Sequence, residues 1–240
     1  TLTVAGIPVV QKVFEVLDPT ISLKLEHGDG ETITTGQVIA TLEGSTRSIL
    51  TGERVALNFL QHLSGIATLT KQYCEAVRGY PAKILDTRKT TPGLRKLEKW
   101  AVTMGEGLNH RMSLNDGILI KDNHLAILKA RGMDITQTCR LAKATGPHGL
   151  RICVEIESLG DIDKALEGQA DVVLLDNMTP ELVHQAVTQI KGRAIVEVSG
   201  GITLRNVVEF AAAGADYISI GALTHSAPAV DISLDIPFLA

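Results

Sequence analysis

The amino-acid sequence predicts an α/β protein whose larger part is a β/α barrel. Beyond Pro81, six short aliphatic runs alternate with helical patterns, and the last four recur about every 20 to 23 residues, the length of one βα unit. Almost every run ends in polar residues or glycine, and in β/α barrels such strand ends converge at one rim, where active sites lie. No G-x-G-x-x-G pattern is present, which disfavours an open dinucleotide-binding sheet. The six runs are 83–85, 117–120, 152–154, 172–175, 194–196 and 217–220.

Helical patterns fill the gaps between these runs, for example at 179–190 and 204–213. Six strands are fewer than the eight of a complete barrel, and a weak further strand is predicted through 108–110.

The region from Val4 to Thr51 is interpreted as a small β-rich domain. Residues 22–26 alternate apolar and polar side chains at the strand period, 27–30 form a turn, and 38–42 form the next strand. The phrase from Gly28 to Ile39 is similar to half of a biotinyl or lipoyl carrier motif. However, Glu43-Gly44-Ser45 offers no lysine to modify, so a structural hairpin is expected.

A helix is predicted over 52–77, because apolar residues recur there at helical spacing. Within it, Gly65 is expected to mark a kink or a close-contact point.

Composition narrows the class of protein. No apolar run reaches the roughly 18 residues that span a bilayer, and the net charge of −4 disfavours a nucleic-acid binder. The three cysteines have no C-x-x-C spacing, which indicates a cytoplasmic protein and argues against a cysteine-based metal site. Because the first residue is Thr1, an upstream segment is expected.

The stretch from Lys83 to Lys121 is locally basic, with eight Lys/Arg against four Asp/Glu in an otherwise acidic chain. Arg95, Lys96 and Lys99 are assigned to a solvated helical face. The remaining cations indicate a small anionic ligand.

Two glycine-rich strand ends predict a phosphate site. Ser199-Gly200-Gly201 is followed about 20 residues later by Gly221-Ala222, and loops after the last two strands of β/α barrels bind phosphate through backbone N–H groups.

Cations follow three other strand ends: Arg88-Lys89, then His110-Arg111, then Lys121. Arginine binds carboxylates in a bidentate manner, while lysine acts as a point charge for phosphate or carboxylate.

Two acids, Glu155 and Asp176, follow the strand-end rule at adjacent strands. They are candidates to hold Mg²⁺ or ribose hydroxyls, or to form a general acid/base pair as in glycosidases; the surrounding cations favour an anionic substrate. Glu157 and Asp161 are interpreted as solvated.

Eight motifs, in order along nearly the whole chain, resemble the quinolinate phosphoribosyltransferase (decarboxylating) family. They lie at 53–58, 63–68, 86–90, 109–111, 120–124, 174–177, 199–201 and 221–224. One departure is Thr91, where many relatives carry an apolar residue. The resemblance implies an incomplete TIM-like barrel of six or seven strands at 63–225. It also implies a smaller α/β sandwich domain at 1–62 plus 226–240, and additional N-terminal residues.

The resemblance also implies a type II phosphoribosyltransferase of NAD biosynthesis that converts quinolinate and phosphoribosyl pyrophosphate (PRPP) to nicotinate mononucleotide, CO₂ and pyrophosphate. It implies a homodimer, or a higher assembly such as a hexamer, with shared active sites, and Mg²⁺ held by Glu155 and Asp176, directly or through water. Lys89, Lys121, Glu155 and Asp176 are the expected catalytic residues. The quinolinate ligands are expected to be Arg54 (from the partner subunit), Arg88, His110, Arg111 and Lys121. The PRPP and phosphate ligands are expected to be Lys89, Glu155, Asp176, Ser199, Gly200, Gly201, Gly221 and Ala222.

Other functions remain open at this point. A sister phosphoribosyltransferase for nicotinate or a molybdenum-operon substrate would need fewer carboxylate-binding cations. A phosphate-binding isomerase or aldolase would need an isolated base or Schiff-base lysine, for which Lys121 is the one candidate. The interpretation as a non-catalytic carrier module is weakened, because the hairpin tip lacks the lysine that such carriers need for modification.

Overall fold

The computed structural model describes residues 1–236, which form two compact units. The first unit comprises 1–72, 89–108 and the chain from Gly221 onward, and the second comprises 73–88 and 109–220. The domain boundaries expected at 62 and 225 stay a prediction. In the first unit the elements are β1 (Leu2–Thr3), α1 (Ile7–Leu17), β2 (Ser22–Leu25), β3 (Thr32–Ile33), β4 (Ala40–Glu43), α3 (Arg95–Met104), α9 (Ala222–His225) and most of α2 (Thr46–Ala76).

The second unit is built on one parallel sheet of six strands in the order β5-β10-β9-β8-β7-β6. The six predicted aliphatic runs are these strands: β5 (Lys83–Leu85), β6 (Ile118–Ile120), β7 (Ile152–Ile156), β8 (Val172–Asp176), β9 (Ile195–Ser199) and β10 (Tyr217–Ser219). The weak strand expected at 108–110 is reduced to a single bridge residue, Leu108. This α/β fold with a central parallel sheet confirms the predicted fold class.

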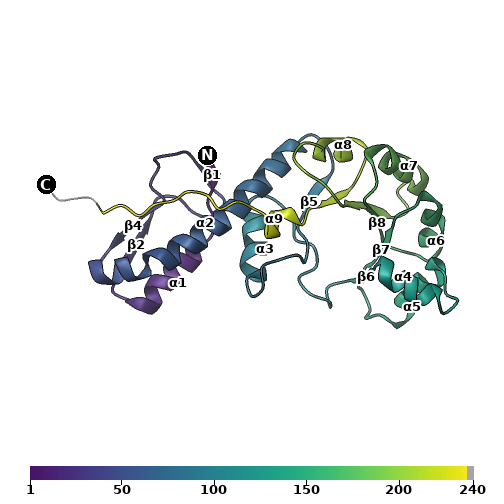
Figure 1. The fold of residues 1–240 in the computed structure, drawn as a ribbon, viewed down its shortest axis with the longest axis horizontal. Helices are drawn as coiled ribbons and strands as arrows, with labels where there is room; N and C mark the ends of the chain where they lie inside the picture. Colours follow the sequence, from purple (N-terminus) through teal and green to yellow (C-terminus); the bar gives the residue numbers. More distant parts are fainter. Residues whose placement is uncertain (237–240) are drawn as a thin grey trace. The chain divides into compact units, whose positions relative to one another are not determined.

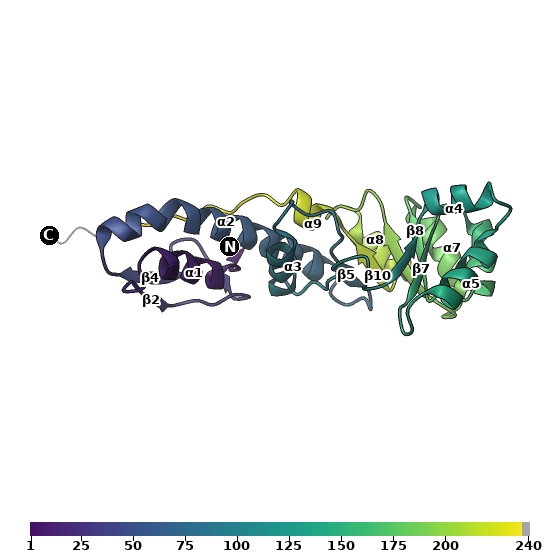
Figure 2. The ribbon, with the colours of Figure 1, turned by 90° about the horizontal axis from the view of Figure 1, so that it is seen from below.

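Helices follow the strands of the sheet, and Figures 1 and 2 show α5 and α7 on the same side of β7 and β8. The sheet face toward the helices is strongly apolar, since Val154, Val173, Leu175, Val196 and Ile218 are all buried. The helical elements of this unit are α4 (Asp122–Lys129), α5 (Ile135–Thr145), the 3₁₀ turn η1 (Leu159–Asp161), α6 (Ile162–Glu167), α7 (Pro180–Ile190) and α8 (Val207–Ala212).

The opposite face of the sheet is apolar near the starts of the strands and polar near their ends. Cys153, Val172 and Leu174 form a small apolar cluster there, packed by Leu119 and Ile195. Because side chains alternate along a strand, the polar residues two positions further on project to the same side. The sequence therefore divides this face into an apolar base and a chemically active rim.

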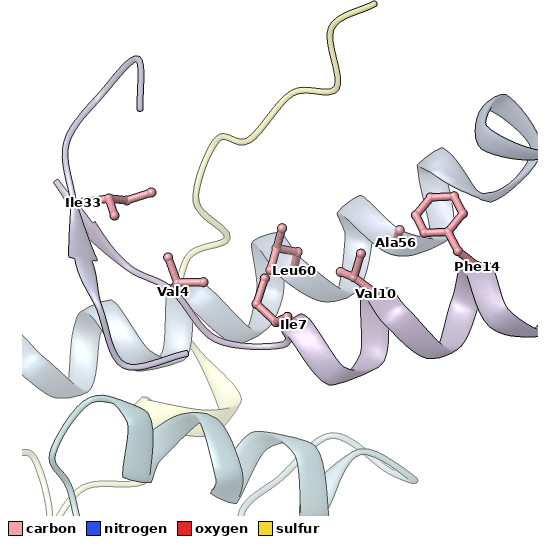
Figure 3. Packing of buried hydrophobic residues seen from close by; sticks show 7 residues of the cluster. All are labelled: Val4, Ile7, Val10, Phe14, Ile33, Ala56 and Leu60. Atoms are coloured by element: carbon pink, nitrogen blue, oxygen red, sulfur yellow. The ribbon is translucent and has the colours of Figure 1, made fainter. Parts of the chain in front are cut away.

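In the first unit, α1 packs along α2, and the interpretation of 4–51 as β-rich was wrong for this helix. Figure 3 shows Ile7, Val10 and Phe14 of α1 turned toward Ala56 and Leu60 of α2. These α1 positions are spaced three and four apart, which places them on one helical face. The helix was not predicted because its buried residues are β-branched or aromatic, and these residue types are also common in strands.

The remaining strands of the first unit form two antiparallel pairs, β1 with β3 and β2 with β4. Asp29, in the loop between β2 and β3, accepts hydrogen bonds from the N–H groups of Gly6 and Ile7, at 3.0 and 2.9 Å. It thus caps the start of α1 from a distant loop, and the indole N–H of Trp100 donates to the same carboxylate at 3.0 Å.

The prediction for Gly65 is confirmed as a close contact. A Cβ atom placed on Gly65 would lie 2.1 Å from the carbonyl oxygen of Pro228, so any side chain would displace the C-terminal segment. The assignment of Lys99 to a solvated face was wrong, because Lys99 is fully buried in α3. Arg95 is half-buried and Lys96 is exposed.

Within residues 1–236, no helix combines the length and the apolar composition that crossing a bilayer requires. The cytoplasmic location stays a prediction.

Candidate active site

The two predicted acids lie on adjacent strands and on the same face of the sheet. Glu155 of β7 is paired in register with Leu174 of β8, and Asp176 lies two residues beyond Leu174. Asp176 is in turn paired with Ser199 of β9, whose hydroxyl donates to the Asp176 carboxylate at 2.6 Å. Three predicted site residues are therefore brought together at the ends of three neighbouring strands.

Lys121 completes this group of charges from the end of β6. Its Nζ lies 3.5 Å from Oε2 of Glu155, whose side chain is 10 % exposed while that of Lys121 is 52 % exposed. Burial raises the pKa of Glu155 above its ordinary value, the charge of Asp176 raises it further, and Lys121 opposes both effects. Lys121 thus partly offsets the effect of burial on the pKa of Glu155.

This balance predicts the effect of Lys121→Met. Removing the ammonium group should move the pKa of Glu155 further upward, which a ¹³C NMR titration of the carboxyl carbon would measure. Since the pKa in the folded state is then above that of the unfolded chain, folding stability should fall as the pH rises through the window between the two values. Lys129→Met, on the exposed face of α4, is the control, and an unchanged pKa of Glu155 in Lys121→Met would contradict the pairing.

Two arginines form a cationic pair in the second unit. Burial lowers the pKa of Arg111, and the positive charge of Arg88 lowers it further. Nη1 of Arg111 donates to the carbonyl of Gly117 at 2.9 Å, while its buried Nε has no hydrogen-bond partner among residues 1–236. An anionic ligand with two acceptor oxygens would satisfy such a group.

Sequence reasoning missed two buried acids that support this pair. Asp86 is fully buried and accepts the backbone N–H of His110 at 2.8 Å. Glu197, in the middle of β9, lies 3.3 Å from Nε2 of His110. A signal was available, because Glu197 interrupts an aliphatic run that is otherwise typical of a buried strand.

The loop after β9 needs its glycines. Gly200 has a φ of +94°, and a Cβ atom there would lie 2.2 Å from the Asn177 amide oxygen. The side-chain amide of Asn206 donates to the carbonyl of Gly201 at 3.2 Å, which fixes the far end of the loop. Within the described chain, neither glycine N–H is used in a turn or cap hydrogen bond, so both are available to an anion.

In the first unit, Lys89, Gly221 and His225 meet at the start of α9. A Cβ atom on Gly221 would lie 3.1 Å from both Cδ of Lys89 and Nε2 of His225, so a larger residue there would require both side chains to shift by a few tenths of an ångström. The hydroxyl of Thr224 donates to the carbonyl of Lys89 at 2.7 Å and ties the lysine backbone to α9. The sequence predicted Lys89 and Gly221 here but missed His225 and Thr224. Ala222 is the first residue of α9.

Arg54 belongs to the first unit. Its side chain, on α2 in the first unit, is 70 % exposed, and its charged partner there is Glu53 at 3.7 Å. An exposed arginine with such a weak pairing contributes little to stability.

The carboxylate pair is suited to a magnesium ion that is also held by substrate. The described residues contain no group of three or more His, Cys, Asp or Glu side chains that could bind a metal alone. Mg²⁺, however, is commonly bound through one or two carboxylates together with phosphate oxygens and water. Glu155 and Asp176, close enough for their charges to interact, meet that requirement.

Both parts of the chain match known families of domains. Residues 1–64 match the family model described as the N-terminal domain of quinolinate phosphoribosyl transferase, and residues 66–235 match its C-terminal domain.

Relatives and solved structures agree with these matches. The chain is 43 % identical over 232 residues to the probable nicotinate-nucleotide pyrophosphorylase [carboxylating] of Bacillus subtilis, covering 97 % of this chain and 79 % of the relative. It is 38 % identical over 250 residues to quinolinate phosphoribosyltransferase [decarboxylating] 1b of Nicotiana tabacum, covering 97 % of this chain and 70 % of the relative. The crystal structure of NadC from Streptococcus pyogenes is similar with a TM-score of 0.90 and 43 % identity, over 96 % of this chain and 80 % of that one. The Francisella tularensis nicotinate-nucleotide pyrophosphorylase gives a TM-score of 0.92 at 37 % identity, over 97 % and 81 %.

Proposed function

This chain belongs to the quinolinate phosphoribosyltransferase family, and from that premise we propose how it joins quinolinate to PRPP in NAD biosynthesis. The products are nicotinate mononucleotide, CO₂ and pyrophosphate. The observation that carries the assignment to these residues is that the half-buried Arg88 and Arg111, whose charges interact, lie in the same compact unit as Glu155 and Asp176. The arginines are complementary in charge to the two carboxylates of a pyridine dicarboxylate. The acids are complementary to a ribose that becomes positively charged during the reaction.

Quinolinate is bound mainly through ionic contacts between its carboxylates and cationic side chains. Arg88 and Arg111 take its two carboxylates, and Lys121, which is exposed and beside Glu155, provides a third cation. His110 lies next to Arg111 and supports the same segment. Holding the ring by its carboxylates aims its nitrogen at the anomeric carbon, and such positioning accounts for a large part of the rate in two-substrate reactions.

Glu155 and Asp176 act on the ribose. As the bond to pyrophosphate breaks, positive charge develops on the anomeric carbon and the ring oxygen, and two fixed carboxylates stabilise it electrostatically. The pyridine nitrogen then forms the new C–N bond. No protein nucleophile takes part in this step.

Loss of CO₂ follows from the new bond. A ribosylated pyridine nitrogen is quaternary, so the ring accepts the electron pair that the adjacent 2-carboxyl group leaves behind. A proton from solvent then replaces that carboxyl group, and nicotinate mononucleotide remains.

The phosphate groups of PRPP are assigned to glycine loops and to Lys89. We assign the backbone N–H groups of Gly200 and Gly201, beside Ser199, to the 5-phosphate. In the first unit, Gly221 and Ala222 bind phosphate in the same way, and Lys89 neutralises pyrophosphate. Mg²⁺ held by Glu155 and Asp176 would supply further neutralisation of pyrophosphate.

The direct test is release of ¹⁴CO₂ from quinolinate labelled in the 2-carboxyl group. Release that requires both PRPP and the protein is the expected result. Incubation with nicotinate in place of quinolinate separates the sister phosphoribosyltransferase activity, since that enzyme would form the mononucleotide without CO₂. Product from nicotinate but not from quinolinate would contradict the proposal.

We further propose that active sites are shared in a homodimer, with Arg54 contributed by the partner subunit. Arg54 is exposed, and the neighbouring Leu50 and Val55 on α2 are exposed apolar residues. Exposed apolar side chains around a charged one are typical of a protein interface. A second copy of the chain would bury this surface and give Arg54 an anionic partner.

A mixing experiment tests the shared site. Arg54→Ala and Lys121→Ala subunits should each be nearly inactive alone, but random pairing after mixing should restore about a quarter of the sites, because a mixed dimer keeps one intact combination. A mixture that stays as inactive as its parents would show that Arg54 acts within its own subunit, or not at all. Arg47→Ala, an exposed arginine on the same helix, serves as the control.

A further inference from the structure

Glu197 is a buried carboxylate that none of the roles above uses. It lies on β9, two residues before Ser199, and is 3 % exposed. Its position places it on the same face of the sheet as Glu155 and Asp176. Because a buried carboxylate is costly unless hydrogen bonds compensate it, its partners indicate what it does.

One oxygen of Glu197 has two partners. The hydroxyl of Ser219 donates to Oε1 at 2.5 Å, and Nε2 of His110 lies 3.3 Å from the same atom. Ser219 belongs to the neighbouring strand β10 and anchors the carboxylate to the sheet. His110 belongs to the segment that carries Arg111, so the second contact reaches the quinolinate site.

The other ring nitrogen of His110 settles which tautomer is present. Nδ1 accepts the backbone N–H of Arg111 at 2.6 Å, and a nitrogen that accepts carries no proton. The ring proton therefore lies on Nε2, which faces Glu197. Asp86 holds the backbone N–H of His110 at 2.8 Å, so residues 110–111 are fixed through both the ring and the main chain.

We propose that Glu197 is a positioning residue for quinolinate binding, acting on Arg111 through the imidazole of His110. The Glu197 carboxylate, 3.3 Å from Nε2, stabilises the proton there electrostatically, which keeps Nδ1 as an acceptor, and Nδ1 holds the backbone of Arg111. Glu197 itself touches no substrate. The inference rests on the proposed function and deepens it, because it assigns the placement of Arg111, one of the two arginines that bind quinolinate, to a buried relay from Glu197 through His110.

The relay can be observed without any substrate. ¹⁵N NMR of histidine-labelled protein should show His110, identified by comparison with His110→Gln, as the neutral tautomer protonated on Nε2. In Glu197→Ala this preference should be lost. A wild-type imidazole protonated on Nδ1, or a positively charged one at neutral pH, would overturn the proposal whether or not Glu197→Ala folds.

Steady-state kinetics test the consequence. Glu197→Ala should raise the KM for quinolinate about tenfold or more and leave the KM for PRPP unchanged. Glu197→Gln keeps an acceptor oxygen at the same place and should stay within about threefold of the wild type. Glu209→Ala, an exposed glutamate on α8, controls for loss of a carboxylate as such. Equal rises of both KM values, or an unchanged quinolinate KM in Glu197→Ala, would overturn the relay.

The two experiments separate failure of this inference from failure of the proposed function. If the wild type released no CO₂ from quinolinate, the function would fail, while the tautomer of His110 would still be measured. If the wild type is active and His110 shows the other tautomer, only the relay fails.

Discussion

Replacing Arg111 by alanine should weaken quinolinate binding about a hundredfold or more, while PRPP binding changes little. The side chain of Arg111 is half-buried, its buried Nε has no hydrogen-bond partner within the described chain, and its Nη1 is fixed by the carbonyl of Gly117. Removing one member of a buried, hydrogen-bonded charge pair costs about 2–5 kcal/mol, and each 1.4 kcal/mol is a factor of ten in affinity. Isothermal titration of the variant with each substrate separately measures the effect.

The control for this prediction is Arg151→Ala, which removes an exposed arginine from the same unit. It should bind both substrates as the wild type does. Equal losses of quinolinate and PRPP affinity in Arg111→Ala would contradict the role of Arg111 as a ligand of the quinolinate carboxylates. Folding of the variant can be checked independently by thermal unfolding.

The six strands of the second unit could be predicted because each is a short aliphatic run with polar residues after it. Such runs need burial on both faces, which a parallel sheet covered by helices provides. The same rule located Asp176 and Ser199, whose side chains meet at 2.6 Å. A strand end is a local property, so the sequence alone was sufficient there.

Residues that act through distant partners were harder to predict. Glu197 lies inside a strand, and its role depends on His110, which is 87 positions away in the chain. Likewise, α1 is capped by Asp29 from another loop and not by its own N-cap residue, Gly6, so the usual start signal was missing. Lys99 was misplaced for a related reason, because burial of a lysine follows from packing and not from local pattern.

Asp176→Asn should lower kcat about a hundredfold to a thousandfold, which is the second large effect that we expect. The asparagine has the same shape and keeps an oxygen for the hydroxyl of Ser199, so the main loss is one negative charge. Removing one fixed electrostatic group that stabilises developing charge costs about 3–4 kcal/mol in the transition state. Single-turnover measurement of C–N bond formation would separate this chemical step from product release.

Whether Asp176→Asn changes kcat or KM shows which role Asp176 has. A carboxylate that stabilises charge present only in the transition state changes kcat, whereas one that binds ribose or metal-bound PRPP equally in both states changes KM. A variant with an unchanged kcat and a raised KM for PRPP would therefore restrict Asp176 to substrate binding. Asp163→Asn, at an exposed aspartate of α6, should change neither constant. Because the amide of Asn177 donates to Asp176 at 2.7 Å, Asn177→Ala should accompany the test, to show that a reoriented neighbour is not the cause of the loss.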